Sequence, residues 1–208
     1  MHPRNPPLNR DVFINCPFDA EYKPLFEAIC FTISACGFTP RCALEEIDSG
    51  DTRIEKISRI IAGSALGIHD TSRTESGATG LPRFNMPFEL GLFLGCKFFG
   101  GKLQRGKRTL ILDVEPYRYQ RFLSDISGQD IEAHRGDCER AIAVVRDWLQ
   151  SFSPDLLDGP VHLVAKFKWF RKDLDRMVAE LGVEEGKLSF RDLATIVRRW
   201  LYLQILAG

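Results

Sequence analysis

Short apolar runs alternate along the first half of the chain with segments in which apolar residues recur at helical spacing. The runs are rich in β-branched and aromatic residues, which is typical of buried strands. They span residues 11–15, 38–44, 64–70 and 108–113. Strand and helix thus alternate four times. This pattern predicts an α/β fold, a flavodoxin-like parallel sheet with helices on both faces.

The second half of the chain has a different pattern. Residues 114–135 are irregular and polar, and Asp137 then caps a further helix. Proline and glycine near residues 153–160 mark a boundary, and two helices follow, the second beginning at a capping box of Ser189 and Asp192. We therefore expect a flexible proline-rich arm over residues 1–9, an α/β domain over 10–153 and a C-terminal helical extension over 160–208.

Composition narrows the function classes. Apolar residues make up 44% and charged residues 27%, and the formal net charge is zero, so nothing indicates a nucleic-acid or anionic-membrane partner. The six cysteines form no CxxC pair, and neither they nor the four histidines have metal-ligand spacing. The N-terminus is too polar for a signal peptide, and Glu89 and Lys97 interrupt the longest apolar run. We expect a cytoplasmic protein with reduced thiols, no metal and no membrane span.

Polar and turn-rich segments follow each predicted strand. They cover residues 16–19, 45–51, 70–83 and 113–119. The carboxyl ends of parallel strands meet at one edge of a sheet, and ligands bind there in open α/β folds. These four segments therefore predict a binding site at that edge.

The stretch over residues 81–95 places one carboxylate, Glu89, among leucines and phenylalanines. Ionised carboxylates avoid such surroundings unless they are paired or solvated. Pro87 suits the first turn of a helix, so Glu89 is expected in that turn, where the helix dipole favours an anion. Glu89 is then either a functional carboxylate at the mouth of a cleft or an acidic residue that only reflects helix-start preference.

The order of these features resembles a known superfamily. A first strand is followed by Cys16-Pro-Phe-Asp19 and a helix, a third strand ends at Asp70, and Phe88-Glu-Leu-Gly91 begins the next helix. This order resembles the nucleoside 2-deoxyribosyltransferase-like proteins and the related TIR (Toll/interleukin-1 receptor) domains. The resemblance covers roughly residues 10–135 and leaves the C-terminal helices outside.

The resemblance implies a flavodoxin-like fold and a role for Glu89. It puts Glu89 in the place of the nucleophile of the deoxyribosyltransferases, or of the glutamate with which TIR domains cleave the nicotinamide–ribose bond of NAD. In bacteria it implies defence against phage, through depletion of NAD or an ADP-ribose signal. NAD is then a substrate, and no cofactor is implied.

The chemistry of N-glycosidic cleavage agrees with this placement. Positive charge builds up on the anomeric carbon of the sugar, where a carboxylate attacks it or stabilises it. Nicotinamide leaves NAD without a proton donor, whereas a neutral base needs one. Asp70 is the candidate acid, unless it is only a turn residue at the end of its strand.

The substrate-binding candidates lie in the same segments, and each has a plainer alternative. Arginines suit a phosphate or are merely solvated, the aromatic ring stacks on a base or joins the core, and the asparagine binds a ribose hydroxyl or caps the helix. The cysteine has no histidine nearby and is more readily a small buried residue than a nucleophile. These candidates are Cys16, Phe18, Asp19, Ser72, Arg73, Arg83 and Asn85.

The sequence thus favours a nucleotide N-glycosidase, with NAD+ as the leading substrate. The alternatives are a deoxyribosyltransferase-like enzyme and a non-catalytic module that binds a nucleotide signal or oligomerises. A homo-oligomer or a partner defence protein is expected to bind through the C-terminal helices, where exposed Trp169, Trp200 or Tyr202 would indicate an interface. Residues 124–134 either close over the cleft, contact a second subunit or form a solvated loop.

Overall fold

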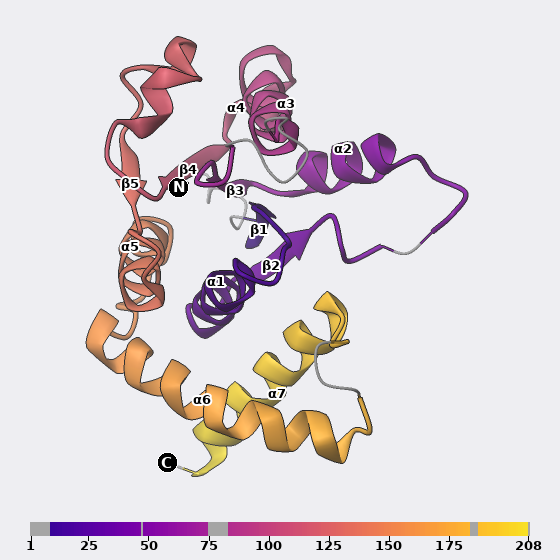
Figure 1. Ribbon diagram of the computed structural model, residues 1–208, viewed down its shortest axis with the longest axis vertical. Coiled ribbons are helices and arrows are strands. Elements are labelled where there is room, and N and C mark those ends of the chain that lie inside the picture. Colours follow the sequence, from indigo (N-terminus) through magenta and orange to yellow (C-terminus); the bar gives the residue numbers. More distant parts are fainter. Residues whose placement is uncertain (1–8, 47, 75–82, 184–186, 208) are drawn as a thin grey trace, which may run out of the picture.

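The described residues of the computed structural model, 9–46, 48–74, 83–183 and 187–207, form one five-stranded sheet (Figure 1). Its strands are β1 (Asp11–Asn15), β2 (Thr39–Cys42), β3 (Leu66–Asp70), β4 (Arg108–Asp113) and β5 (Ile131–Ala133). All neighbours pair in parallel, in the order β2-β1-β3-β4-β5. This is the strand order of flavodoxin-like folds, so the predicted fold class is confirmed. Most of the predicted N-terminal arm, the loop over residues 75–80, and Leu81 and Pro82 lie outside the described residues.

Helices cover both faces of the sheet, and a further pair adds a fourth layer. On one face lie α2 (Arg53–Gly63), α3 (Asn85–Phe99) and the short α4 (Lys102–Arg105); on the other lie α1 (Lys23–Ala35) and α5 (Cys138–Gln150). The hairpin of α6 (Pro160–Glu180) and α7 (Phe190–Ala207) packs against the outer side of α1 and α5 (Figure 1). None of the helices in the described residues is both long and apolar enough to cross a membrane.

The fifth strand corrects the prediction of four. Residues 114–135, expected to be irregular, contain two 3-10 turns, Arg118–Arg121 and Ser124–Ile126, and then β5 at the edge of the sheet. Ile131 pairs with Ile111 of β4, and Ala133 pairs with Asp113. Three residues are too few to show an alternating pattern, so tertiary pairing and not local sequence defines this strand.

Alternating side chains of the strands divide the core. Val12 and Ile14 of β1 face α1 and α5, whereas Phe13 between them packs with Phe93 and the isoleucines of α2. The α6–α7 hairpin belongs to the first of these cores, because its apolar residues pack in one cluster with those of the sheet. They include Leu163, Phe167, Phe170, Leu174, Phe190, Ile196, Val197 and Trp200.

Helix α1 is covered on one side by the sheet and on the other by the α6–α7 hairpin. Every residue from Leu25 to Ile33 is buried, including Glu27 and Thr32. A helix that is buried all round occurs in the interior of larger folds, whereas a surface helix buries only one stripe. The predicted helical extension is therefore a layer of the same packed body.

The caps of two helices form as the sequence predicts, and two helices end at glycines. Asp137 caps α5 by accepting hydrogen bonds from the backbone N–H groups of Glu139 and Arg140, and Ser189 and Asp192 form the reciprocal contacts of a capping box. Gly37 and Gly182, at the ends of α1 and α6, have φ values of 77° and 66°. That left-handed conformation is favourable for glycine alone among common residues, which explains why both helices stop there.

The shared core predicts that the hairpin and the sheet unfold together. Phe170 is fully buried, whereas the adjacent Trp169 is 64% exposed. We expect Phe170→Ala to lower the free energy of unfolding by about 3–5 kcal/mol, and Trp169→Ala to change it by roughly 0.5 kcal/mol or less. Urea denaturation followed by far-UV circular dichroism measures both. A separate early transition for the hairpin in wild-type protein would contradict the shared core.

Candidate functional site

Helix α3 carries Glu89, but one turn later than predicted. The helix begins at Asn85 after Phe84 as N-cap, so Pro87 is its third residue and Glu89 its fifth. Glu89 therefore lies beyond the first turn, where the helix dipole acts most strongly, and the expected stabilisation of its charge by the dipole is wrong. Asn85 is the first helical residue and exposed, so its alternative role as the cap is wrong as well.

Asn15 fixes the start of α3 over the sheet. Its side-chain amide, buried at the end of β1, donates to the carbonyl oxygen of Met86 at 2.8 Å and lies 3.1 Å from Nδ1 of His69. Burial lowers the pKa of His69 to about 3, so this ring is neutral and its Nδ1 can accept from the amide. The first turn of α3 is thus tied to the carboxyl ends of β1 and β3.

Glu89 is buried, and its ion pair with Arg53 is a long one. Its carboxyl group is buried, and this desolvation raises its pKa to about 7 although Arg53 opposes the shift. Nη2 of Arg53 lies 3.9 Å from Oε1 of Glu89, and the Arg53 side chain is 58% exposed. Among the described residues, Glu89 therefore neither extends into bulk solvent nor pairs with a cation in the interior.

Electrostatic effects on two cysteines place Glu89 at the carboxyl edge of the sheet. Burial is the main reason why the pKa values of Cys16 and Cys42 are raised, and the negative charge of Glu89 adds to it in both. Cys42 ends β2 and Cys16 follows β1, so Glu89 lies near the ends of these strands. The edge between β1 and β3, where the strand order reverses, is the usual ligand site of this fold.

Asp70 occupies a different environment from Glu89. It is fully buried and accepts hydrogen bonds from the hydroxyl of Tyr22 at 2.6 Å and from the backbone N–H of Ser72 at 2.8 Å. Nε2 of His134 lies 3.0 Å from the same carboxylate, without the alignment of a hydrogen bond. Nδ1 of His134 accepts from the N–H of Gly136, so a neutral ring carries its proton on Nε2, towards Asp70. Asp70 therefore ties three segments together inside the protein.

Three of the predicted substrate-binding residues come together in an ion-pair cluster. Arg83 donates to Oδ2 of Asp19 at 2.7 Å, and Nε of Arg73 lies 3.4 Å from the same oxygen. Arg73 also pairs with Glu21. Burial raises the pKa of Asp19, but Arg83, the N–H of Tyr22 and Arg73 together bring it below its ordinary value. Because Arg83 lies two residues before α3, the cluster joins the loop after β1 to the helix that carries Glu89.

Two further candidates lie on the α1 side of the edge. Cys16 is buried and its thiol pKa is raised well above the ordinary value, first by desolvation and then by Asp70, so the thiol stays protonated and is a poor nucleophile. Phe18 packs edge-on against Phe26 and lines a cavity of about 370 Å³ between the loop after β1 and the start of α7. Asp19 also lines this cavity, whereas Glu89 does not.

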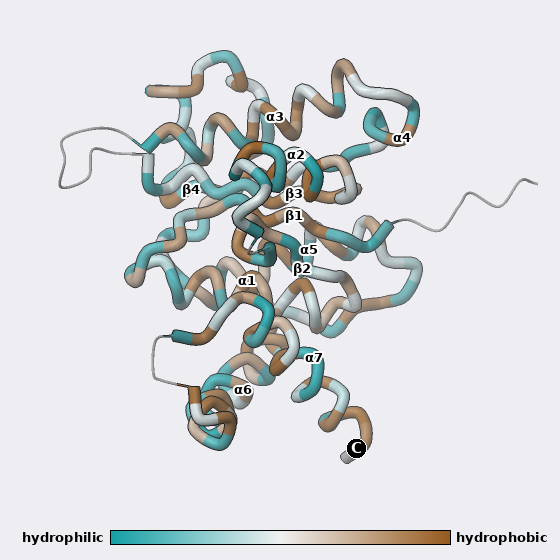
Figure 2. The backbone as a smooth tube through the Cα atoms, turned by 90° about the vertical axis from the view of Figure 1, so that its right-hand side faces the viewer, coloured by the Kyte–Doolittle hydropathy of each residue, from teal (hydrophilic) through white to brown (hydrophobic). Residues whose placement is uncertain are grey.

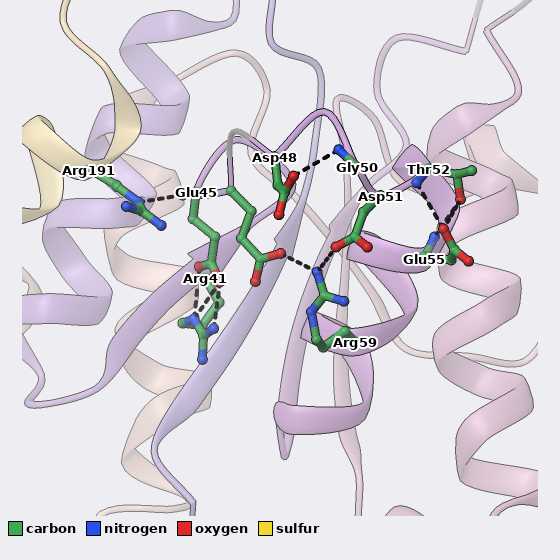
Figure 3. A network of polar contacts seen from close by, with 10 residues as sticks. Arg41, Glu45, Asp48, Gly50, Asp51, Thr52, Glu55, Arg59 and Arg191 are labelled. Carbon is green, nitrogen blue, oxygen red and sulfur yellow. Dashed lines mark hydrogen bonds and ion pairs between the residues drawn. The ribbon is translucent and has the colours of Figure 1, made fainter.

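A polar network shapes the loop between β2 and α2 (Figure 3). Arg59 of α2 donates to Glu46 and to Asp51, both at 2.6 Å, and Thr52 forms a capping box with Glu55. Arg191 of α7 donates to the backbone carbonyl of Glu45. Arg53, the first residue of α2, follows the N-cap Thr52 directly, so the network holds the start of the helix that carries the cation next to Glu89.

The sequence pattern did not single out Asn15, Tyr22 or Arg53. Each acts through a partner at least 36 residues away, namely Met86, Asp70 and Glu89. Within residues 124–134, the structure buries His134 against Asp70 and leaves Asp125, Gln129 and Asp130 exposed. Among the residues that the structure describes, no group of three or more histidine, cysteine or acidic side chains could hold a metal ion.

Comparisons of the chain with protein-family models, with curated proteins and with solved structures found no match. The resemblance to TIR-like and deoxyribosyltransferase-like proteins therefore stays a prediction from the sequence.

The raised pKa of Glu89 predicts how stability depends on pH. The unfolded chain releases this proton near pH 4.5 and the folded chain near 7, so the unfolded state binds fewer protons between these values and stability falls as pH rises. The shift corresponds to about 3 kcal/mol. Glu89→Gln cannot ionise. Its free energy of unfolding should therefore rise relative to that of wild type by up to about this amount between pH 5 and pH 8.

Urea denaturation at a series of pH values measures this difference. Glu180→Gln, at an exposed glutamate near the end of α6, is the matched control and should follow wild type. Parallel stability curves for wild type and Glu89→Gln would contradict a desolvated Glu89.

Proposed function

We propose that the protein is a nucleotide N-glycosidase whose catalytic residue is Glu89, and that its substrate is NAD+. The observation that carries the proposal is a carboxyl group with a pKa of about 7, buried at the carboxyl edge of a flavodoxin-like sheet. Acids with strongly shifted pKa values concentrate at functional sites. The resemblance of Phe88-Glu-Leu-Gly91 to the glutamate segment of the TIR-like and deoxyribosyltransferase-like proteins adds to it.

The proposed reaction uses the ionised form of Glu89. As the nicotinamide–ribose bond breaks, the carboxylate attacks the anomeric carbon or stabilises its positive charge, and water completes the hydrolysis. Low local polarity strengthens this attraction, because the charge of Glu89 has few competing solvent contacts. Arg53 keeps part of the Glu89 population ionised, and Arg73 and Arg83 are suited to the pyrophosphate.

The position of Asp70 supports NAD+, and not a neutral nucleoside, as the substrate. Loss of a neutral base needs a proton donor that reaches the leaving group, and Asp70 was the candidate acid. Its carboxylate is fully buried and bonded to Tyr22 and Ser72. Nicotinamide needs no such donor, since it departs from a cationic pyridinium. The deoxyribosyltransferase alternative predicts exchange of free bases with deoxynucleosides, which a chromatographic assay of both substrates distinguishes from NAD+ hydrolysis.

The setting that we propose is the bacterial cytoplasm, in defence against phage or in signalling by an ADP-ribose product. Partners would bind through the C-terminal helices, either as further copies of the chain or as another defence protein. Trp169 and Tyr202 are exposed there, as an interface requires, whereas Trp200 is buried and donates to Asp173. Trp200 is therefore a core residue and gives no support to an interface. A module that binds a nucleotide without turnover would use the same residues without chemistry at Glu89.

Glu89→Gln tests the proposal directly. The amide keeps the size of the side chain but cannot attack or carry charge, so we expect release of nicotinamide from NAD+ to fall by at least about a hundredfold. Release is measured by chromatography with purified protein, alone and under conditions that promote assembly. Glu180→Gln should retain full activity. Unchanged turnover in Glu89→Gln removes Glu89 from the reaction.

The pH dependence of the reaction provides a second test. Because the ionised carboxylate is the reactive form, kcat/KM should rise with pH through about 7, the pKa of Glu89. Arg53 lowers that pKa, so Arg53→Gln should move the rise to higher pH. Arg108→Gln, an exposed arginine at the start of β4, is the control and should leave the profile in place. A profile that falls as pH rises through 7 would assign Glu89 the opposite role, that of an acid.

A further inference from the structure

The outer face of α3 is apolar over its whole length, and none of the residues that the structure describes covers it. Phe84, Phe88, Phe98 and Phe99 are 56–90% exposed, and a side-chain carbon built on Gly91 or Gly95 meets nothing within 4 Å. At 100° per residue these six positions fall within one stripe roughly 100° wide. We call these six residues the α3 stripe.

Charge is also missing from the α3 stripe. Between Phe84 and Phe99 the chain has two charged residues, Glu89 and Lys97. Glu89 is buried on the inner side, and the ammonium group of Lys97 lies 6.0 Å from the ring centre of Phe98. A helix that is apolar on both faces is normally buried on both, as α1 is in this protein. The stripe therefore requires a partner surface.

Four of the six stripe residues have the order that suits a second copy of the chain as that partner. The pattern is nearly the same when it is read in either direction from Phe93: Gly91 and Gly95 are each two residues away, and Phe88 and Phe98 are each five residues away. In a twofold, antiparallel crossing, Phe88 of one copy lies opposite Phe98 of the other, and Gly91 lies opposite Gly95. Twofold contacts require this kind of self-complementarity.

Size and charge agree with such a contact. The four phenylalanines expose on the order of 500 Å² per chain, given roughly 200 Å² for each ring. Two copies thus bring together roughly 1,000 Å² of aromatic surface, which is close to the lower limit for specific interfaces before the helix backbone is added. Glycines at the centre allow the two helix axes to approach closely, and no like charges on the stripes meet.

We propose that two copies of the chain associate through the α3 stripe as a twofold dimer. This contact lies at the opposite end of the molecule from the α6–α7 hairpin (Figure 2). It buries the outer face of the same helix that carries Glu89 on its inner face. The inference rests on exposure and symmetry alone and does not depend on the proposed N-glycosidase activity.

Sedimentation equilibrium of the full chain over a wide concentration range tests the dimer. Gly91→Gln fills the centre of the stripe, and Phe98→Ser removes an aromatic contact; each should raise the dimer dissociation constant roughly tenfold or more. Because glutamine is a better helix former than glycine and the site is open, Gly91→Gln should not lower the urea midpoint measured at concentrations where wild type is monomeric. Loss of the dimer without loss of stability separates docking from folding.

Two controls make the test specific. Gly63→Gln introduces the same side chain at an equally open glycine at the end of α2, and Tyr202→Ser removes an exposed ring from α7. Gly63→Gln should dimerise like wild type, and Tyr202→Ser should leave the α3 dimer intact even if it weakens further assembly through the C-terminal helices. A chain that stays monomeric overturns the proposal, as does a dimer that persists in both α3 variants. If Tyr202→Ser alone dissociates the dimer, the contact lies on the C-terminal helices and the assignment to α3 is overturned.

Discussion

Helix α1 lies between the sheet and the α6–α7 hairpin, and the burial of its whole circumference connects these two layers. Its inner side packs on the strands, and its outer side contacts Phe167, Phe170 and Trp200. Phe31 is in ring contact with all three. The two faces of α1 therefore share one hydrophobic core, and a change in either layer acts on the other.

The carboxyl edge of the sheet is organised by polar residues at the ends of three strands. Asn15 holds the first turn of α3, Asp70 holds the loop after β1 through Tyr22, and Asp113 accepts from Arg118 at 2.7 Å. Arg118 also donates to the carbonyl of Thr71, which joins the loops after β3 and β4. Each of these buried groups has hydrogen-bond partners, as buried polar groups require. Glu89 differs from them, because its only charged neighbour among the described residues is Arg53 at 3.9 Å. That contrast is the structural basis on which we propose a chemical role for Glu89.

The sequence predicted those structural features that a pattern of a few neighbouring residues can encode. Four strands, the helices between them, the caps at Asp137 and Ser189 and the stops at Gly37 and Gly182 each leave a signal within a few residues. Strand β5 left none, because three residues paired only with β4 show no period. Glu89 was identified from its apolar surroundings, but its place in the helix was wrong because Pro87 tolerates the third helical position as well as the first. The contacts of Asn15, Tyr22 and Arg53 depend on residues distant in sequence, so only the folded arrangement reveals them.

The position of the α6–α7 hairpin after the five strands in the chain also has a consequence for biosynthesis. All five strands and α1 are translated before Phe170 and Trp200. Until the hairpin has been made, the outer side of α1 has no cover. The nascent chain therefore carries an exposed apolar helix face while the segments between α1 and the hairpin are translated. Such intermediates bind chaperones and aggregate readily. A chain that ends before α7 would therefore leave the outer side of α1 without its packing against Trp200.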